Sequence, residues 1–129
     1  MSSRVVHFEI HADDPERAAK FYTDVFDWVV QQWPGGEQEY WLIKTGSDEE
    51  PGIDGGLLKR KVPLAGEGVM AYVCTLHTES VDEATQRVTE HGGQVVVPKM
   101  PIPGVGWLAY CKDTESNVFG VMQDDQSAK

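Results

Sequence analysis

The fold is decided near the start of the chain, by the stretch VVHFEIHADDPERAAKFY at residues 5–22. Its first six residues are rich in β-branched and aromatic types, which is typical of a β-strand. Alternation along this strand places His7, Glu9 and His11 on one face and apolar side chains on the other. The apolar face must be covered, whereas the polar face fits either a surface in bulk water or the lining of a cavity.

A helix is predicted directly after this strand. Asp14 is a suitable N-cap, and Pro15 stands at the first helical position, where its missing N–H costs nothing. An amphipathic stripe follows at helical spacing, formed by Ala18, Phe21, Tyr22, Val25 and Phe26. A half-buried strand followed at once by such a helix is the start of a β-α-β unit.

The rest of the chain predicts the order β-α-β-β-β and then the same order again. After the first strand and helix, further strands are expected at 28–33, 40–45, 54–61, 69–76, 94–98, 107–112 and 118–123. A turn is expected at 34–36, a connector at 63–68, and a helix capped by Ser80 and ended by a glycine pair. A loop is expected from Pro98 to Gly106, and its last part, residues 103–106, is expected to be mobile.

The two halves align with each other at a shift of 66 residues, which matches residues 14–18 to residues 80–84. The same shift places Val73 opposite His7 and Thr75 opposite Glu9. Such a repeat predicts one domain over residues 1–129, made of two modules at about 4–62 and 68–123, with a flexible tail at 124–129.

Length, composition and net charge limit the classes of function that the chain can have. The chain has 129 residues, 40% of them hydrophobic and 25% charged, as expected of one globular domain. Its net charge of −10 disfavours nucleic acid and anionic membranes as partners and favours a cationic ligand or plain solubility. No apolar run approaches the roughly 20 residues that span a bilayer. The absence of a leader pattern and the spacing of Cys74 and Cys111 favour a reduced, cytoplasmic setting.

The sequence resembles the vicinal oxygen chelate superfamily, which includes glyoxalase I, fosfomycin- and bleomycin-resistance proteins and extradiol dioxygenases. The resemblance runs from about Val5 to about Gln123 and is carried by residues 7–28, 81–84, 92–93 and 113–117. It implies an α+β fold in which two βαβββ modules in tandem form a concave mixed sheet with the helices outside. It also implies a homodimer.

Metal-dependent members of this superfamily hold a divalent ion in the concave cavity. When the metal-ligand positions of these members are carried over to this sequence, the first ligand falls on His7. The equivalent position in the second half is Val73, which has no donor atom. The closing ligand positions fall on Gly120 and near Gly55-Gly56, which lack side chains. A divalent site needs about three protein ligands, so no metal or other cofactor is expected. The alternative is a divalent metal at His7, with Glu9 and a third group such as Asp54 or His11.

His7 and Glu9 are the candidate catalytic residues, because a carboxylate beside an imidazole favours its charged form near neutral pH. His7 could instead be a structural group that only lines the cavity. The predicted ligand-binding residues are His7, Glu9, Tyr40, Trp41, Val73, Thr75, Trp107 and Gly120. Either Tyr40 or Trp41 is expected to face the cavity, and Trp107 to act as a lid or a stacking surface.

Three functions remain open from the sequence. The first is a protein that binds a small aromatic or cationic molecule in the cavity without metal, as the bleomycin-resistance branch does. The second is a metal-dependent lyase, isomerase or dioxygenase with non-standard ligands. The third is a metal-free enzyme in which His7 and Glu9 transfer protons.

Overall fold

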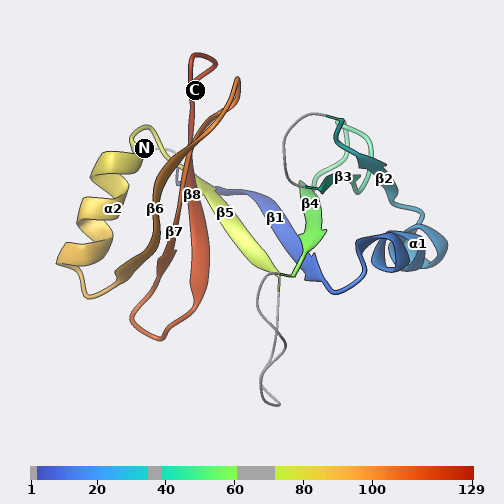
Figure 1. Ribbon diagram of the computed structural model, residues 1–129, viewed down its shortest axis with the longest axis horizontal. Helices are drawn as coiled ribbons and strands as arrows, with labels where there is room; N and C mark the ends of the chain where they lie inside the picture. The colour runs from blue at the N-terminus through green and yellow to red at the C-terminus, as the bar shows by residue number, and fades with distance from the viewer. Residues whose placement is uncertain (1–2, 35–38, 61–71) are drawn as a thin grey trace. The chain divides into compact units, whose positions relative to one another are not determined.

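The computed structural model describes residues 3–34, 39–60 and 72–129, and within them the predicted α+β class is confirmed (Figure 1). The order βαβββ occurs twice. The elements are β1 (Val5–Ala12), α1 (Pro15–Phe26), β2 (Val29–Gln32), β3 (Tyr40–Lys44), β4 (Asp54–Lys59), β5 (Val73–His77), α2 (Val81–Glu90), β6 (Gln94–Ile102), β7 (Gly106–Lys112) and β8 (Val118–Asp124). Residues 35–36 of the expected turn, the connector at 63–68 and the start of the strand expected at 69–76 lie outside the described residues.

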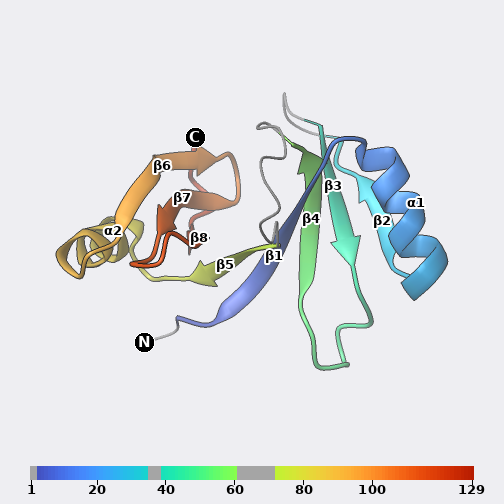
Figure 2. The same ribbon diagram turned by 90° about the horizontal axis from the view of Figure 1, so that it is seen from below.

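The chain divides into two compact units, residues 7–72 and residues 73–129 together with the first six. In the unit of residues 7–72, hydrogen bonds order the strands β2-β3-β4-β1. The β1–β4 pair is parallel and the other two pairs are antiparallel. Helix α1 runs alongside this sheet (Figure 2). Its side chains cover a core built from Phe8, Ile10, Ala12, Trp41, Ile43 and Leu57.

Helix α1 begins as the sequence predicts. The Asp14 side chain accepts a hydrogen bond from the Arg17 backbone N–H at 3.2 Å, and Pro15 follows it. The predicted apolar stripe is only half covered, however. Ala18 and Tyr22 pack on the core, whereas Phe21 and Phe26 stay more than half exposed. The helix therefore rests on the sheet along a narrower contact than its periodicity indicates.

In the other unit, the order is β5-β8-β7-β6, with a parallel β5–β8 pair and two antiparallel pairs. Helix α2 packs on one face through Val81, which is fully buried against Ala109 and Val121. The Ser80 side chain caps this helix by accepting from the Glu83 N–H at 3.1 Å. Among the described residues, no helix is long and apolar enough to cross a membrane.

The expectation of a long loop between Pro98 and Gly106 is wrong. Strand β6 continues to Ile102, through register shifts against β7, so only residues 103–105 connect the two strands. Prolines break most strands because they cannot donate to the ladder. Here Pro98 and Pro101 lie on an edge strand, where one side needs no donor.

The C-terminal tail also differs from its expectation, because it has an apolar anchor. Ala128 is only 3% exposed, and its carbonyl accepts a hydrogen bond from the Gly104 N–H at 3.1 Å. The Asp125 N–H donates to the Val105 carbonyl at 2.9 Å. The tail thus folds back on the β6–β7 hairpin.

Candidate functional site

The polar face of β1 is the centre of the candidate site. His7 is partly buried, and Glu9 is a carboxylate only 6% exposed. The parallel register with β4 places His7 beside Asp54 and Glu9 beside Gly56. A carboxylate at this depth needs polar partners, so the face is built around hydrogen bonds.

Tyr40 joins His7 on this face. On β3 it alternates with Trp41, and its side chain lies on the face of His7 while Trp41 joins the core under α1. Its hydroxyl lies 3.1 Å from His7 Nε2. Gly56 makes this possible, because a Cβ at position 56 would overlap the Tyr40 hydroxyl. Of the two alternatives on β3, Tyr40 is thus the residue on the polar face.

Burial sets the electrostatics of the site. It lowers the pKa of His7 below its ordinary value of 6.5, and the opposing charges of Glu9 and Asp54 do not offset it. The expectation that the adjacent carboxylate favours the charged imidazole is therefore wrong in its net direction. Burial, followed by the Glu9 charge, raises the pKa of Tyr40. At neutral pH the site thus presents a neutral imidazole and a protonated phenol.

A pocket of about 340 Å³ opens on this face, and we call it the His7 pocket. It contains apolar surface from β2 and β3 as well as polar groups, and its lining is His7, Val29, Gln31, Leu42, Ile43, Lys44, Asp54 and Gly55. Lys44 is paired with Asp48 at 3.1 Å, and Asp54 Oδ1 accepts from the Thr45 N–H at 2.9 Å. The pocket therefore combines an apolar wall with a neutral imidazole and a fixed carboxylate.

The second half repeats part of this arrangement in its own sheet. Thr75, 4% exposed, is the register partner of Gly120, just as Glu9 is the partner of Gly56. A Cβ at Gly120 would lie within 3.5 Å of Thr75, Tyr110 and Leu108. Val73 is the first residue of β5. The repeat read from the sequence thus extends to the pairing of each first strand with its last strand.

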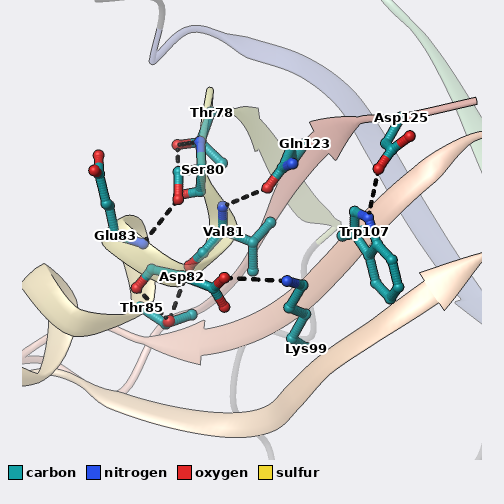
Figure 3. A network of polar contacts seen from close by, with 10 residues as sticks. All are labelled: Thr78, Ser80, Val81, Asp82, Glu83, Thr85, Lys99, Trp107, Gln123 and Asp125. Atoms are coloured by element: carbon teal, nitrogen blue, oxygen red, sulfur yellow. Dashed lines mark hydrogen bonds and ion pairs between the residues drawn. The ribbon is translucent and has the colours of Figure 1, made fainter. Parts of the chain in front are cut away.

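The two tryptophans that the sequence predicted as ligand-binding residues are not part of the lining of the His7 pocket. Trp41 is 7% exposed in the core under α1. Trp107 packs against the cluster beneath α2, where its Nε1–H donates to Asp125 at 3.0 Å and the Lys99 ammonium lies 4.8 Å from its ring centre (Figure 3). These contacts are structural in kind, and they account for both side chains without a ligand.

The residues present do not fit a divalent metal ion. Within the described ranges, no three or more His, Cys, Asp and Glu side chains are grouped to hold one. His7 Nε2 is engaged by Tyr40, and the Tyr40 hydroxyl occupies the space above Gly56. The position that would have to carry a further ligand is therefore filled by a phenol.

Sequence reasoning missed five residues that line the His7 pocket, which are Val29, Gln31, Leu42, Ile43 and Lys44. The signal for Leu42 and Lys44 was available, because both lie on the same face of β3 as Tyr40. The sequence did not show which of the two faces of the strand packs against the helix.

Comparisons with known proteins agree with this architecture. A family model described as bleomycin resistance protein-like N-terminal matches residues 4–46. A glyoxylase-like domain-containing protein of Didymella fabae is 26% identical over 125 residues, with 94% of each chain covered. CFP32 of Mycobacterium bovis, named as a candidate glyoxylase, is 26% identical over 118 residues. That match covers 89% of this chain but only 43% of the mycobacterial protein.

Solved structures share the fold at low identity. A methylmalonyl-CoA epimerase in complex with methylmalonyl-CoA and NH4+ superposes with a TM-score of 0.70 at 17% identity, covering 100% of this chain and 99% of that one. The epimerase from Mycobacterium tuberculosis gives 0.65 at 12% identity, covering 94% and 87%. The chain therefore has the fold of the glyoxalase-type proteins. These likenesses agree with the resemblance of its sequence to the vicinal oxygen chelate superfamily.

Proposed function

We propose that the chain binds a small molecule with an apolar, aromatic body and a cationic or hydrogen-bond-donating head in the His7 pocket, without a metal ion. The observation that carries the proposal is the uncharged, partly buried imidazole of His7 beside the Asp54 carboxylate. Both groups accept hydrogen bonds, whereas Leu42 and Val29 supply apolar contact.

Charge supports a cationic head over an anionic one. The net charge is −10, and the ammonium group of Lys44, which lines the pocket, is already paired with Asp48. An anion would therefore meet an acidic surface and two carboxylates near His7. A cation would meet Asp54 and the neutral imidazole.

The test is calorimetric titration with three probes of one shape: 2-naphthylmethylamine, 2-naphthylmethanol and 2-methylnaphthalene. Affinity is expected to fall in that order. His7→Ala should lower the affinity for the alcohol and for the amine by roughly five- to tenfold, which is the contribution of one hydrogen bond. Asp54→Asn should lower the affinity for the amine alone. His91→Ala is the control, because His91 is exposed on the other unit. Equal binding of all three probes, or none by any, would refute the proposal.

A second candidate function is metal-free proton transfer by His7 and Glu9. It is supported by the juxtaposition of a neutral imidazole and a buried carboxylate on one strand face. Its test is exchange of carbon-bound hydrogen of dihydroxyacetone in D2O, followed by proton NMR. Exchange by the wild type that His7→Gln abolishes would favour an enzyme over a binding protein.

Assembly and location are proposals of their own. We infer a homodimer from the superfamily and a cytoplasmic setting from two free cysteines, of which Cys111 is buried and Cys74 exposed. Light scattering on the purified chain tests the first, since a monomeric mass at micromolar concentration would contradict it.

A further inference from the structure

Trp33 directly follows β2 and lies on the polar face of the sheet formed by residues 7–72. Its backbone N–H donates to the Tyr40 carbonyl at 2.7 Å, which continues the antiparallel pairing of β2 with β3 by one residue. Alternation along β2 places the Trp33 side chain on the same face as Gln31, which lines the His7 pocket. The partly buried indole therefore lies on the face of the pocket although it is not part of its lining.

Two neighbours flank the Tyr40 side chain across the sheet. The ring centres of Trp33 and Tyr40 lie 6.0 Å apart with their planes at 72°, which is an edge-to-face contact. On the other side, the strand register pairs Tyr40 with Leu58 of β4, which is only 8% exposed. Residues directly opposite each other on neighbouring strands have Cβ atoms about 4.5–5.5 Å apart, so both flanks of Tyr40 are occupied.

The Tyr40 side chain extends along the polar face toward Gly56. Gly56 is the register partner of Leu42, which lies two residues after Tyr40 on β3. A Cβ at position 56 would overlap the Tyr40 hydroxyl, so the phenol crosses the backbone of this glycine. The hydroxyl then lies 3.1 Å from His7 Nε2. One ring contact and one hydrogen bond thus connect Trp33 to His7.

We propose that Trp33 is a positioning residue that holds the Tyr40 phenol over Gly56 and against His7, and so fixes the imidazole that meets the ligand. This role rests on the proposed function for its ligand. The hydrogen bond to Tyr40 restricts rotation of the His7 ring, and a side chain that is already held loses less conformational freedom when a ligand binds. Without the indole, one flank of Tyr40 is open, the phenol is free to turn away, and His7 loses its partner.

The first experiment measures the nuclear Overhauser effect between ring protons of Tyr40 and His7 in the ligand-free chain. The two sets of signals are assigned by their loss in Tyr40→Phe and His7→Gln. The effect is expected in the wild type, because the hydroxyl and Nε2 are in contact. It should be lost in Trp33→Ala and in Trp33→Leu, and Trp33→Phe should retain it, since a phenyl ring restores the aromatic contact.

Phe21→Ala is the matched control for the first experiment. It removes another edge-to-face contact to a tyrosine, the one between Phe21 and Tyr22 at 5.2 Å on helix α1, and should leave the Tyr40–His7 effect unchanged. A side chain that only stabilises the end of β2 would, when removed, lower the unfolding free energy and leave the folded site as it was. An intact Tyr40–His7 effect in folded Trp33→Ala or Trp33→Leu would therefore refute the positioning role.

The second experiment tests whether Trp33 acts through His7. Calorimetry measures the affinity for 2-naphthylmethanol in Trp33→Ala, in His7→Ala and in the double variant. Trp33→Ala should lower the affinity by roughly threefold or more in the wild-type background and by less than about twofold in the His7→Ala background, because coupled residues are not additive. An equal loss in both backgrounds would show that the indole contacts the ligand itself, and would overturn the proposal. If the wild type binds no probe, the proposed function fails, and the Tyr40–His7 effect in the ligand-free chain still decides the role of Trp33.

Discussion

A buried imidazole resists protonation unless its neighbours offset the loss of water. At His7 two carboxylates act in the opposite direction, yet burial is the larger effect and the pKa falls. The sequence alone predicted the opposite, because it showed Glu9 two residues away and did not show how deeply the pair is enclosed. The protonation state of this ring decides whether His7 can accept a hydrogen bond from a ligand.

The lowered pKa of His7 predicts a pH-dependent stability. In the unfolded chain the pKa returns to about 6.5, so below that pH the unfolded chain binds a proton that the folded chain resists. The unfolding free energy is therefore fully present above pH 6.5 and falls as the pH drops toward the folded-state pKa. Urea unfolding at pH 7.5 and 5.5 should show a smaller loss in His7→Gln than in the wild type. An equal loss in both would contradict the lowered pKa, and His91→Gln is the control.

Gly56 is the residue on which the Tyr40 position depends. Gly56→Ala would place a Cβ on the Tyr40 hydroxyl, with Glu9 beside it in register. The variant should lose roughly 1–3 kcal/mol of unfolding free energy in urea, as overpacked sites do. Gly46→Ala is the matched control, since its new Cβ would meet only Glu50 at 3.5 Å. Equal stability of the two variants would show that the phenol lies elsewhere.

At the scale of elements, the departures from expectation are an extended edge strand and an anchored tail. Prolines in residues 98–103 indicated a loop, but an edge strand tolerates them and β6 runs on to Ile102. The hairpin that results binds Asp125 and Ala128 through backbone hydrogen bonds. Trp107 is then held between Asp125 and Lys99 beneath α2 (Figure 3).

The anchored tail predicts a difference between two neighbouring substitutions. Ala128→Asp places a carboxylate at a site 3% exposed and should lower the unfolding free energy by roughly 1–3 kcal/mol. Gln126→Asp adds the same charge at an exposed position and should change it little. Urea unfolding measures both. If Ala128→Asp is as stable as Gln126→Asp, the tail is not packed.

At the scale of the whole molecule, the repeat was the most informative sequence feature. It predicted the order of elements, both helix caps and the equivalence of Glu9 with Thr75, because alternation and capping are local properties. The site was less predictable. That Tyr40 and not Trp41 joins His7 depends on which face α1 covers. The place of the Tyr40 phenol over Gly56 depends on the strand registers, which the local sequence pattern does not contain.

Binding of a ligand in the His7 pocket without a metal ion is tested most directly by calorimetry. 2-Naphthylmethylamine is titrated into wild-type protein before and after treatment with EDTA, and the metal content is determined in both samples. Metal-free binding predicts dissociation constants that agree within about twofold, with His7→Ala weaker by roughly fivefold or more in each sample. Binding that EDTA abolishes and one divalent ion restores at stoichiometric amount would contradict it.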